Sequence, residues 1–273
     1  MHVARLRSLL FAPAAEERKL RKALEAGADA VIADLEDGTA PGEKEEARAI
    51  VEAVFGEPAA ERSTRILRVN AVETEWFAGD LELVARLAVD FVMLPKATPD
   101  AVEALGSAGP PVLAIVETAA GLRLAYETGS TNRVTALVLG THDLGAELST
   151  KPRPDGLEVL YARSKVVADS AAAGLPPPFD TVYLDVRDTE GVEREAELAR
   201  SLGFGGKLCI HPAQVEPVNL IFTPSEAELE WARRVLAAYR EALRDGRGVV
   251  ALDGRMVDMP IVRQAERLLG DEA

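Results

Sequence analysis

Cysteine, long apolar runs and positive charge are all scarce in this chain of 273 residues. The single cysteine, Cys209, excludes an internal disulfide and is typical of a protein of the reducing cytoplasm. It lies within the apolar run 207–210, so we expect a buried thiol that contributes to packing and not a nucleophile.

Negative charge dominates, and no segment looks like a membrane anchor. There are 31 lysine and arginine residues against 45 aspartate and glutamate residues, a formal net charge of −14 at pH 7. This excess argues against nucleic acid and anionic membranes as partners. No apolar stretch reaches the roughly 18 residues of a spanning helix. Residues 1–11 have neither a long apolar stretch nor a cleavage pattern, so we expect no signal peptide.

Short apolar runs alternate with helical patterns along most of the chain. The expected strands are residues 8–12, 30–35, 65–69, 91–94, 112–116, 136–139, 179–184 and 206–210. Helical periodicity between most of them indicates βαβ units and a parallel sheet. These units match a (β/α)8 barrel, which typically takes about 250 residues. A doubly wound open sheet is the alternative, but it usually begins with a glycine-rich turn, and residues 12–15 contain no glycine.

The end of the chain is surplus to the barrel. It contains a strongly amphipathic helix over 225–243, a loop or short hairpin over 246–254 and a last helix over 259–269. We therefore expect two parts. Residues 1–222 form the barrel, and residues 223–273 form a C-terminal helical extension that serves as a lid or an oligomer contact.

Two carboxylates follow apolar runs that are expected to be neighbouring strands. Glu117 comes directly after the run 112–116, and Asp143 follows the run 136–139 after a short turn. The segment between them is long enough for a helix, so one strand–helix–strand unit would bring both acids to the same rim of the barrel. Two hard oxygen ligands there suit Mg²⁺, which leaves other positions for water and substrate. We therefore expect a magnesium site.

Further charged residues are expected at the same rim. Arg68 lies near the end of its strand, where a guanidinium can bind the carboxylate of a small anionic substrate. The alternative for Arg68 is a structural ion pair with a rim acid. Glu36 and Asp37 are expected around the metal, where they could hold its water ligands. Lys96 is expected to order these acids, in preference to forming a Schiff base.

Eight motifs follow one another along nearly the whole chain. They are RSLLFAP (7–13), DLEDGTAPGEKEEAR (34–48), RVN (68–70), LPKA (94–97), IVETAAGL (115–122), LGTHDL (139–144), GFGGKLCIHPAQ (203–214) and GRMVDMP (254–260). In this order they resemble the citrate lyase beta-subunit family of the HpcH/HpaI aldolase/citrate lyase superfamily. That family is grouped with the malyl-CoA and citramalyl-CoA lyases.

The resemblance implies a Mg²⁺-dependent carbon–carbon lyase built on a (β/α)8 barrel. Such an enzyme would cleave or form a short 3-hydroxyacyl-CoA bearing a carboxylate, with acetyl-CoA and a 2-keto acid such as oxaloacetate, pyruvate or glyoxylate as products. By the same resemblance, Glu117 and Asp143 are the metal ligands, with Glu117 also at the substrate, and Arg68 binds the substrate carboxylate. Asp258 matches a catalytic acid that related lyases supply from a C-terminal lid, often across a trimer interface.

The resemblance also implies where CoA binds. Arg18 and Lys22, in the expected first helix, match cations that bind the CoA phosphates. One departure is Ala14, which stands where the family usually has a glycine.

Two alternatives remain beside the acyl-CoA lyase. One is a class II pyruvate aldolase that uses the metal without CoA. The other is a subunit that is active only within a citrate lyase complex, with its substrate on a partner's acyl carrier. We expect a cytoplasmic homo-oligomer, a trimer or a hexamer.

Overall fold

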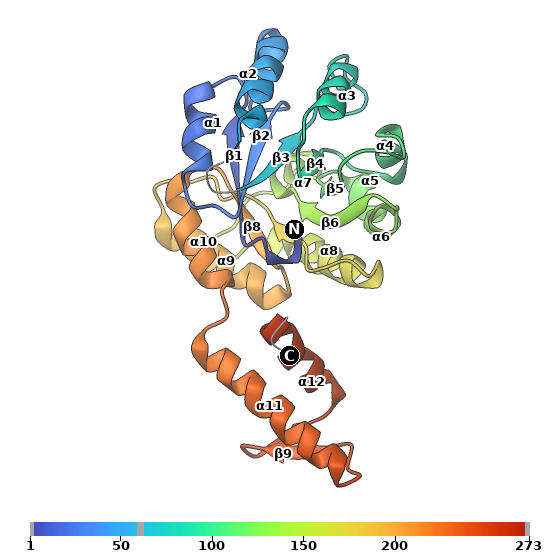
Figure 1. Ribbon diagram of the computed structural model, residues 1–273, viewed down its shortest axis with the longest axis vertical. Helices are drawn as coiled ribbons and strands as arrows, with labels where there is room; N and C mark the ends of the chain where they lie inside the picture. Colours follow the sequence, from blue (N-terminus) through green and yellow to red (C-terminus); the bar gives the residue numbers. More distant parts are fainter. Residues whose placement is uncertain (1–2, 59–62, 271–273) are drawn as a thin grey trace. The chain divides into compact units, whose positions relative to one another are not determined.

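The computed structural model describes residues 3–58 and 63–270 of the chain, and its central feature is a closed barrel of parallel strands (Figure 1). The strands are β1 (Ser8–Pro13), β2 (Ala30–Asp34), β3 (Thr64–Arg68), β4 (Phe91–Leu94), β5 (Val112–Val116), β6 (Val134–Leu139), β7 (Phe179–Asp180) and β8 (Gly206–Cys209). They are hydrogen-bonded in sequence order, and β8 pairs with β1 to close the ring. The predicted (β/α)8 barrel is confirmed, and the open-sheet alternative is wrong.

Helices connect the strands. They are α1 (Glu17–Leu24), α2 (Lys44–Gly56), α3 (Phe77–Arg86), α4 (Pro99–Ala104), α5 (Ala119–Arg123), α6 (Ala125–Gly129), α7 (Thr141–Glu147), α8 (Leu160–Ala172), α9 (Thr189–Leu202) and α10 (Val215–Phe222). Short 3-10 turns lie at Val3–Arg5, Pro41–Glu43, Leu157–Val159 and Pro212–Gln214. The single helix expected between β5 and β6 is replaced by the two short helices α5 and α6.

Alternation along the strands produces two apolar layers. Side chains such as Leu9, Ile32 and Leu113 point into the barrel and form one buried cluster. Their neighbours along the chain, such as Leu10 and Val31, belong to a second cluster that lies between the strands and the helices. Strands covered on both faces read as continuous apolar runs. This is why the runs in the sequence marked the strands so well.

The strand β7 is an exception, because it has only two residues where the sequence indicated six. It pairs with β6 through a single residue pair. Beside it lies a buried group of charges. Lys207 Nζ is 2.9 Å from Asp180 Oδ2 and 2.7 Å from Glu195 Oε2, and Arg163 Nε is 2.9 Å from Asp180 Oδ1. Buried charges are tolerated only when they are paired, as these are.

The predicted burial of Cys209 is confirmed. Burial raises the pKa of its thiol to about 12, so little thiolate exists at neutral pH. The thiol is therefore a packing group.

A second compact unit begins at Thr223, directly after the barrel unit, which ends at Phe222. It contains α11 (Glu226–Arg244), an antiparallel hairpin of β9 (Val250–Leu252) and β10 (Arg255–Val257), and α12 (Met259–Leu269). Its own core joins Leu236 and Tyr239 of α11 to Val262 and Leu269 of α12. Among the described helices, none has both the length and the apolar composition needed to cross a membrane.

Candidate active site

A cavity of about 420 Å³ opens at the carboxyl ends of the barrel strands. Glu117, Asp143, Arg68 and Asp37 all line it, so the structure brings four of the predicted site residues together. Parallel barrels place their chemistry at this rim, because every strand ends there whatever its position in the sequence.

Glu117 follows β5 and is only 4% exposed. Its Oε1 accepts a 2.8 Å hydrogen bond from the backbone N–H of Lys96, a residue held at a positive φ of 48°. Burial, and then the negative charges of Glu36 and Asp143, raise the pKa of Glu117 to about 8. A carboxyl group in this setting keeps its proton near neutral pH unless a cation stands beside it.

Asp143 reaches the same cavity from the first turn of α7. The helix begins close to Glu117, because a Cβ placed on Gly140 would lie 2.7 Å from Glu117 Cβ. The short contact explains why a glycine stands between β6 and α7. It also ties the position of one acid to that of the other.

The two acids fit a magnesium ion. Both supply carboxylate oxygens, and the charge of Arg68 only partly offsets the burial that raises the pKa of Glu117. Within the described ranges, no group of three or more histidine, cysteine or acidic side chains forms a closed metal site. Mg²⁺ is bound in this way, through one or two carboxylates with its other positions left to water and substrate.

Arg68 lies at the cavity wall, but its guanidinium group is already paired with an acid. Its Nε and Nη2 each donate a 2.7 Å hydrogen bond to the two carboxylate oxygens of Asp34, the last residue of β2. Its Nη1 lies 2.9 Å from Glu36 Oε2, and its guanidinium lies 4.9 Å from the ring centre of Phe11. The ion pair that was the alternative for Arg68 is therefore present. Its role in substrate binding stays a prediction.

The other predicted rim residues form a connected set. Lys96 Nζ lies 3.0 Å from Glu36 Oε1, while its backbone N–H bonds Glu117. Glu36 is 7% exposed, and burial raises its pKa. Lys96 thus contacts two acids at once. The ordering role assigned to it remains a prediction.

Three predicted residues lie outside this cavity. Arg18 and Lys22 are exposed on α1, one helical turn apart. Asp258 belongs to the second unit, where it is half-buried at the N-cap position of α12. Its side chain makes no capping hydrogen bond there. The roles assigned to these three residues stay predictions.

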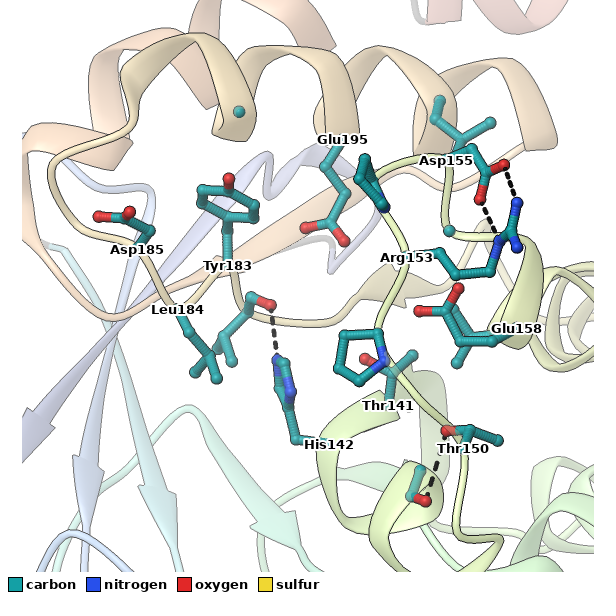
Figure 2. A pocket seen from close by; sticks show the side chains of 18 of the residues that line it. Thr141, His142, Thr150, Arg153, Asp155, Glu158, Tyr183, Leu184, Asp185 and Glu195 are labelled. Atoms are coloured by element: carbon teal, nitrogen blue, oxygen red, sulfur yellow. Dashed lines mark hydrogen bonds and ion pairs between the residues drawn. The ribbon is translucent and has the colours of Figure 1, made fainter.

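A second cavity, of about 600 Å³, adjoins the first and was not foreseen (Figure 2). The two cavities share His142, Val182 and Leu184 in their walls. Figure 2 shows His142 directed at the segment that follows β7, where its Nε2 lies 3.2 Å from the carbonyl oxygen of Val182. Charged side chains, among them Glu158 and Glu195, belong to the remaining wall.

The comparisons with known proteins agree on one family. Residues 7–212 match the HpcH/HpaI aldolase/citrate lyase family. A (3S)-malyl-CoA thioesterase of Cereibacter sphaeroides is 41% identical over 271 residues, which cover 98% of this chain and 95% of the relative. The citrate lyase subunit beta of Escherichia coli is 36% identical over 281 residues, which cover 96% of this chain and 92% of the relative.

Solved structures are similar over the same range. The protein CitE from Mycobacterium tuberculosis, in complex with magnesium, acetoacetate and coenzyme A, superimposes with a TM-score of 0.84 at 36% identity, covering 99% of each chain. A citrate lyase beta subunit of the same organism, in complex with oxaloacetate and magnesium, has a TM-score of 0.73 at 35% identity. That match covers 82% of this chain and all (100%) of the other.

Proposed function

The chain belongs to the HpcH/HpaI aldolase/citrate lyase family, and from this premise we propose that it cleaves, or in reverse forms, a short 3-hydroxyacyl-CoA bearing a carboxylate. The products are acetyl-CoA and a 2-keto acid such as oxaloacetate, pyruvate or glyoxylate. The enzyme is a carbon–carbon lyase, and its cofactor is Mg²⁺, the ion held by the related CitE structures. One observation carries the proposal: Glu117 and Asp143 leave adjacent strands and line one cavity at the barrel rim.

The residues have separate tasks in this reaction. Bound Mg²⁺ supplies a positive charge that stabilises negative charge on the oxygen of the acid portion. Glu117 and Asp143 hold the ion, and Arg68 holds the substrate carboxylate. As the carbon–carbon bond breaks, its electron pair stays with the acetyl fragment, whose methyl carbon must gain a proton. The net reaction moves one proton from the hydroxyl group to this carbon, and Asp258 is the proposed acid–base group.

The pairing of Arg68 with Asp34 supports a binding role as well as a structural one. A guanidinium has five N–H donors; Asp34 takes two of them, and Nη1 faces Glu36. The remaining donors are held in place at the cavity wall, because the bidentate pair fixes the plane of the group. A substrate carboxylate can therefore meet a donor set that is already oriented.

A second candidate function is hydrolysis of the thioester. It is favoured by the 41% identity to proteins named (3S)-malyl-CoA thioesterase, against 36% to the citrate lyase subunit. In that reaction water attacks the thioester carbonyl, and the CoA thiol leaves. The products are a dicarboxylic acid and free CoA, with no keto acid.

Product analysis separates the two reactions. The protein is incubated with Mg²⁺ and (3S)-malyl-CoA or citramalyl-CoA, and keto acid and free thiol are measured in the same sample, with Glu117→Gln as the inactive control. Keto acid formed together with acetyl-CoA supports the lyase. Free thiol without keto acid would contradict the lyase activity and support the thioesterase activity. Turnover only of a carrier-bound thioester would instead identify a subunit of a citrate lyase complex.

Assembly belongs to the same proposal. We expect a homo-oligomer, a trimer or a hexamer, in which the second unit serves as a lid or as an oligomer contact. Light scattering on the purified chain measures its size. A monomer that turns over substrate at full rate would show that activity does not require an oligomer.

A further inference from the structure

The helix α7 must hold Asp143 at the metal site with few contacts of its own. It has only seven residues, and no side chain caps its start, where Gly140 stands. Asp143 is exposed, and none of the hydrogen bonds or ion pairs in the described ranges involves its carboxylate. Its place therefore depends on how the first turn of α7 is attached to the barrel.

Thr181, just after β7, provides that attachment. Its Oγ1 accepts a 3.2 Å hydrogen bond from the backbone N–H of Thr141, the first residue of α7. The hydroxyl of Thr141 lies 3.1 Å from the same oxygen. Thr181 is 2% exposed and Thr141 is 8% exposed, so water does not replace these bonds easily. The hydroxyl of Thr181 thus acts as a cap for α7, because it accepts a hydrogen bond from a backbone N–H group at the start of the helix.

We propose that Thr181 is a positioning residue, which fixes the first turn of α7 and so places Asp143 beside Glu117. The proposal rests on the assignment of Asp143 as a metal ligand in the proposed function. Residues behind metal ligands orient them, and their loss weakens metal binding although they never touch the ion.

Thr181 is itself held from inside the barrel. Its carbonyl oxygen accepts a 2.7 Å hydrogen bond from Lys207 Nζ. Lys207 is fully buried on β8 and pairs with both Asp180 and Glu195. Moving Thr181 would remove one of the three acceptors of this buried ammonium group, which is costly. The attachment point is therefore firm.

Two further contacts fix the rotation of the helix. The residue after Thr141 is His142, whose Nε2 lies 3.2 Å from the carbonyl oxygen of Val182, the residue after Thr181 (Figure 2). On the other side, Gly140 lies against Glu117. The start of α7 is thus held between the segment 181–182 and the other metal ligand. Loss of the Thr181 hydroxyl alone would remove the contacts that hold the start of α7 to Thr181.

The test compares Thr181→Val with Thr181→Ser. Valine keeps the shape of threonine without its hydroxyl, whereas serine keeps the hydroxyl. Mg²⁺ affinity is measured by calorimetry, and Thr181→Val should weaken it about 10- to 100-fold. Thr181→Ser should bind Mg²⁺ nearly as the original protein does. Thr135→Val is the matched control, because it removes a hydroxyl bonded to the Val112 carbonyl oxygen at the far end of β6. It should leave Mg²⁺ affinity unchanged.

Asp143→Asn provides the reference that separates the possible failures. If Asp143→Asn leaves Mg²⁺ affinity unchanged, the metal assignment of the proposed function fails. If Asp143→Asn weakens binding and Thr181→Val does not, the positioning role fails alone. Equal loss in Thr181→Ser or in Thr135→Val also overturns it, because the effect would not then come from this hydroxyl.

A measurement on the unchanged protein covers the case in which Thr181→Val does not fold. Hydrogen exchange of the Thr141 amide should be as slow as that of the buried amides of β6. Exchange at the rate of an exposed loop would contradict the hydrogen bond to Thr181 and overturn the proposal.

Discussion

Glu117 binds its proton more tightly in the folded protein than in the unfolded chain. Its ordinary pKa is 4.5, and burial with nearby negative charge raises it to about 8. A group whose folded pKa is raised contributes stability below its unfolded pKa and loses that contribution as the pH rises through its folded pKa. Between these two values, the metal-free protein should therefore become less stable as the pH increases.

Replacing Glu117 with glutamine should remove this dependence, because glutamine does not ionise. In metal-free buffer, urea unfolding at about pH 5 and about pH 9 should show a larger loss of stability in the original protein, of about 1 kcal/mol or more. Added Mg²⁺ should reduce the loss only when Glu117 is present. Equal pH dependence in both proteins would show that Glu117 is not the group responsible.

Arg68 is best tested with lysine. Alanine would leave Asp34 and Glu36 without their buried partner, at a cost of about 3 to 5 kcal/mol in stability. Lysine keeps the charge but loses the planar fork, so keto acid affinity should fall about tenfold or more. Calorimetry with oxaloacetate or pyruvate in the presence of Mg²⁺ measures this. Unchanged affinity in Arg68→Lys would leave Arg68 with its structural ion pair alone.

The sequence could indicate side chains at strand ends but not their partners. Glu117, Asp143 and Arg68 each follow or close an apolar run, which is a local signal. Asp34 was missed because it sits within such a run, where its bidentate bond to Arg68 cannot be read from neighbours in sequence. Thr181 was missed for the same reason, since its partners lie on α7 and β8.

At the scale of elements, the junction of β6 with α7 lies against Glu117, one of the two proposed metal ligands. A Cβ on Gly140 would lie 2.7 Å from Glu117 Cβ and 2.8 Å from its Oε2, closer than real side chains approach. Gly140→Ala should therefore displace Glu117, lower stability by about 1 to 3 kcal/mol and weaken Mg²⁺ binding. Calorimetry and urea unfolding measure the two effects.

Gly42→Ala is the matched control for this change. A Cβ at Gly42 meets nothing within 4 Å, and its backbone does not require positive φ. It should leave both quantities unchanged. If Gly140→Ala also binds Mg²⁺ normally, the approach of α7 to Glu117 does not set the geometry of the site.

The bounds of a helix or strand were predictable where they depend on the residues of that element alone. The bounds of β4 and β5 match the apolar runs, because these strands are buried on both faces. The early end of β7 was not predictable, because it follows from the partners of Asp180 on other elements. The helix α10 was missed because it is short and contains a proline, and because only Glu216 and Asn219 mark its polar side. Two polar residues in eight give a weak helical period.

At the scale of the whole molecule, the barrel carries the proposed metal ligands, Glu117 and Asp143, and the second unit carries Asp258. The side chain of Asp258 makes no capping hydrogen bond, and asparagine is an equally good N-cap residue of the same size, so Asp258→Asn should be stable and should bind Mg²⁺ normally. If Asp258 exchanges the proton of the acetyl fragment, turnover should fall about 10²-fold or more. Steady-state assays beside calorimetry test this. Normal turnover would end the catalytic assignment.

Mixed oligomers test whether Asp258 acts across subunits. Asp258→Asn chains and Glu117→Gln chains are each expected to be inactive alone. If the second unit of one chain completes the barrel site of another, mixing them should restore part of the activity. Absence of any recovery would confine Asp258 to its own chain.

The short β7 also has a consequence for folding kinetics. Most neighbouring strands join through backbone ladders, but β6 and β7 share one residue pair, and the wall there depends on Lys207, Asp180, Arg163 and Glu195. These ions must lose their bound water before they pair, which raises the barrier to completing this part of the wall. We therefore expect the part of the wall at β7 to be completed late in folding. Reopening the wall there requires the separation of ions whose mutual attraction is strong in the low-dielectric interior, so we expect the barrel to unfold slowly at this point.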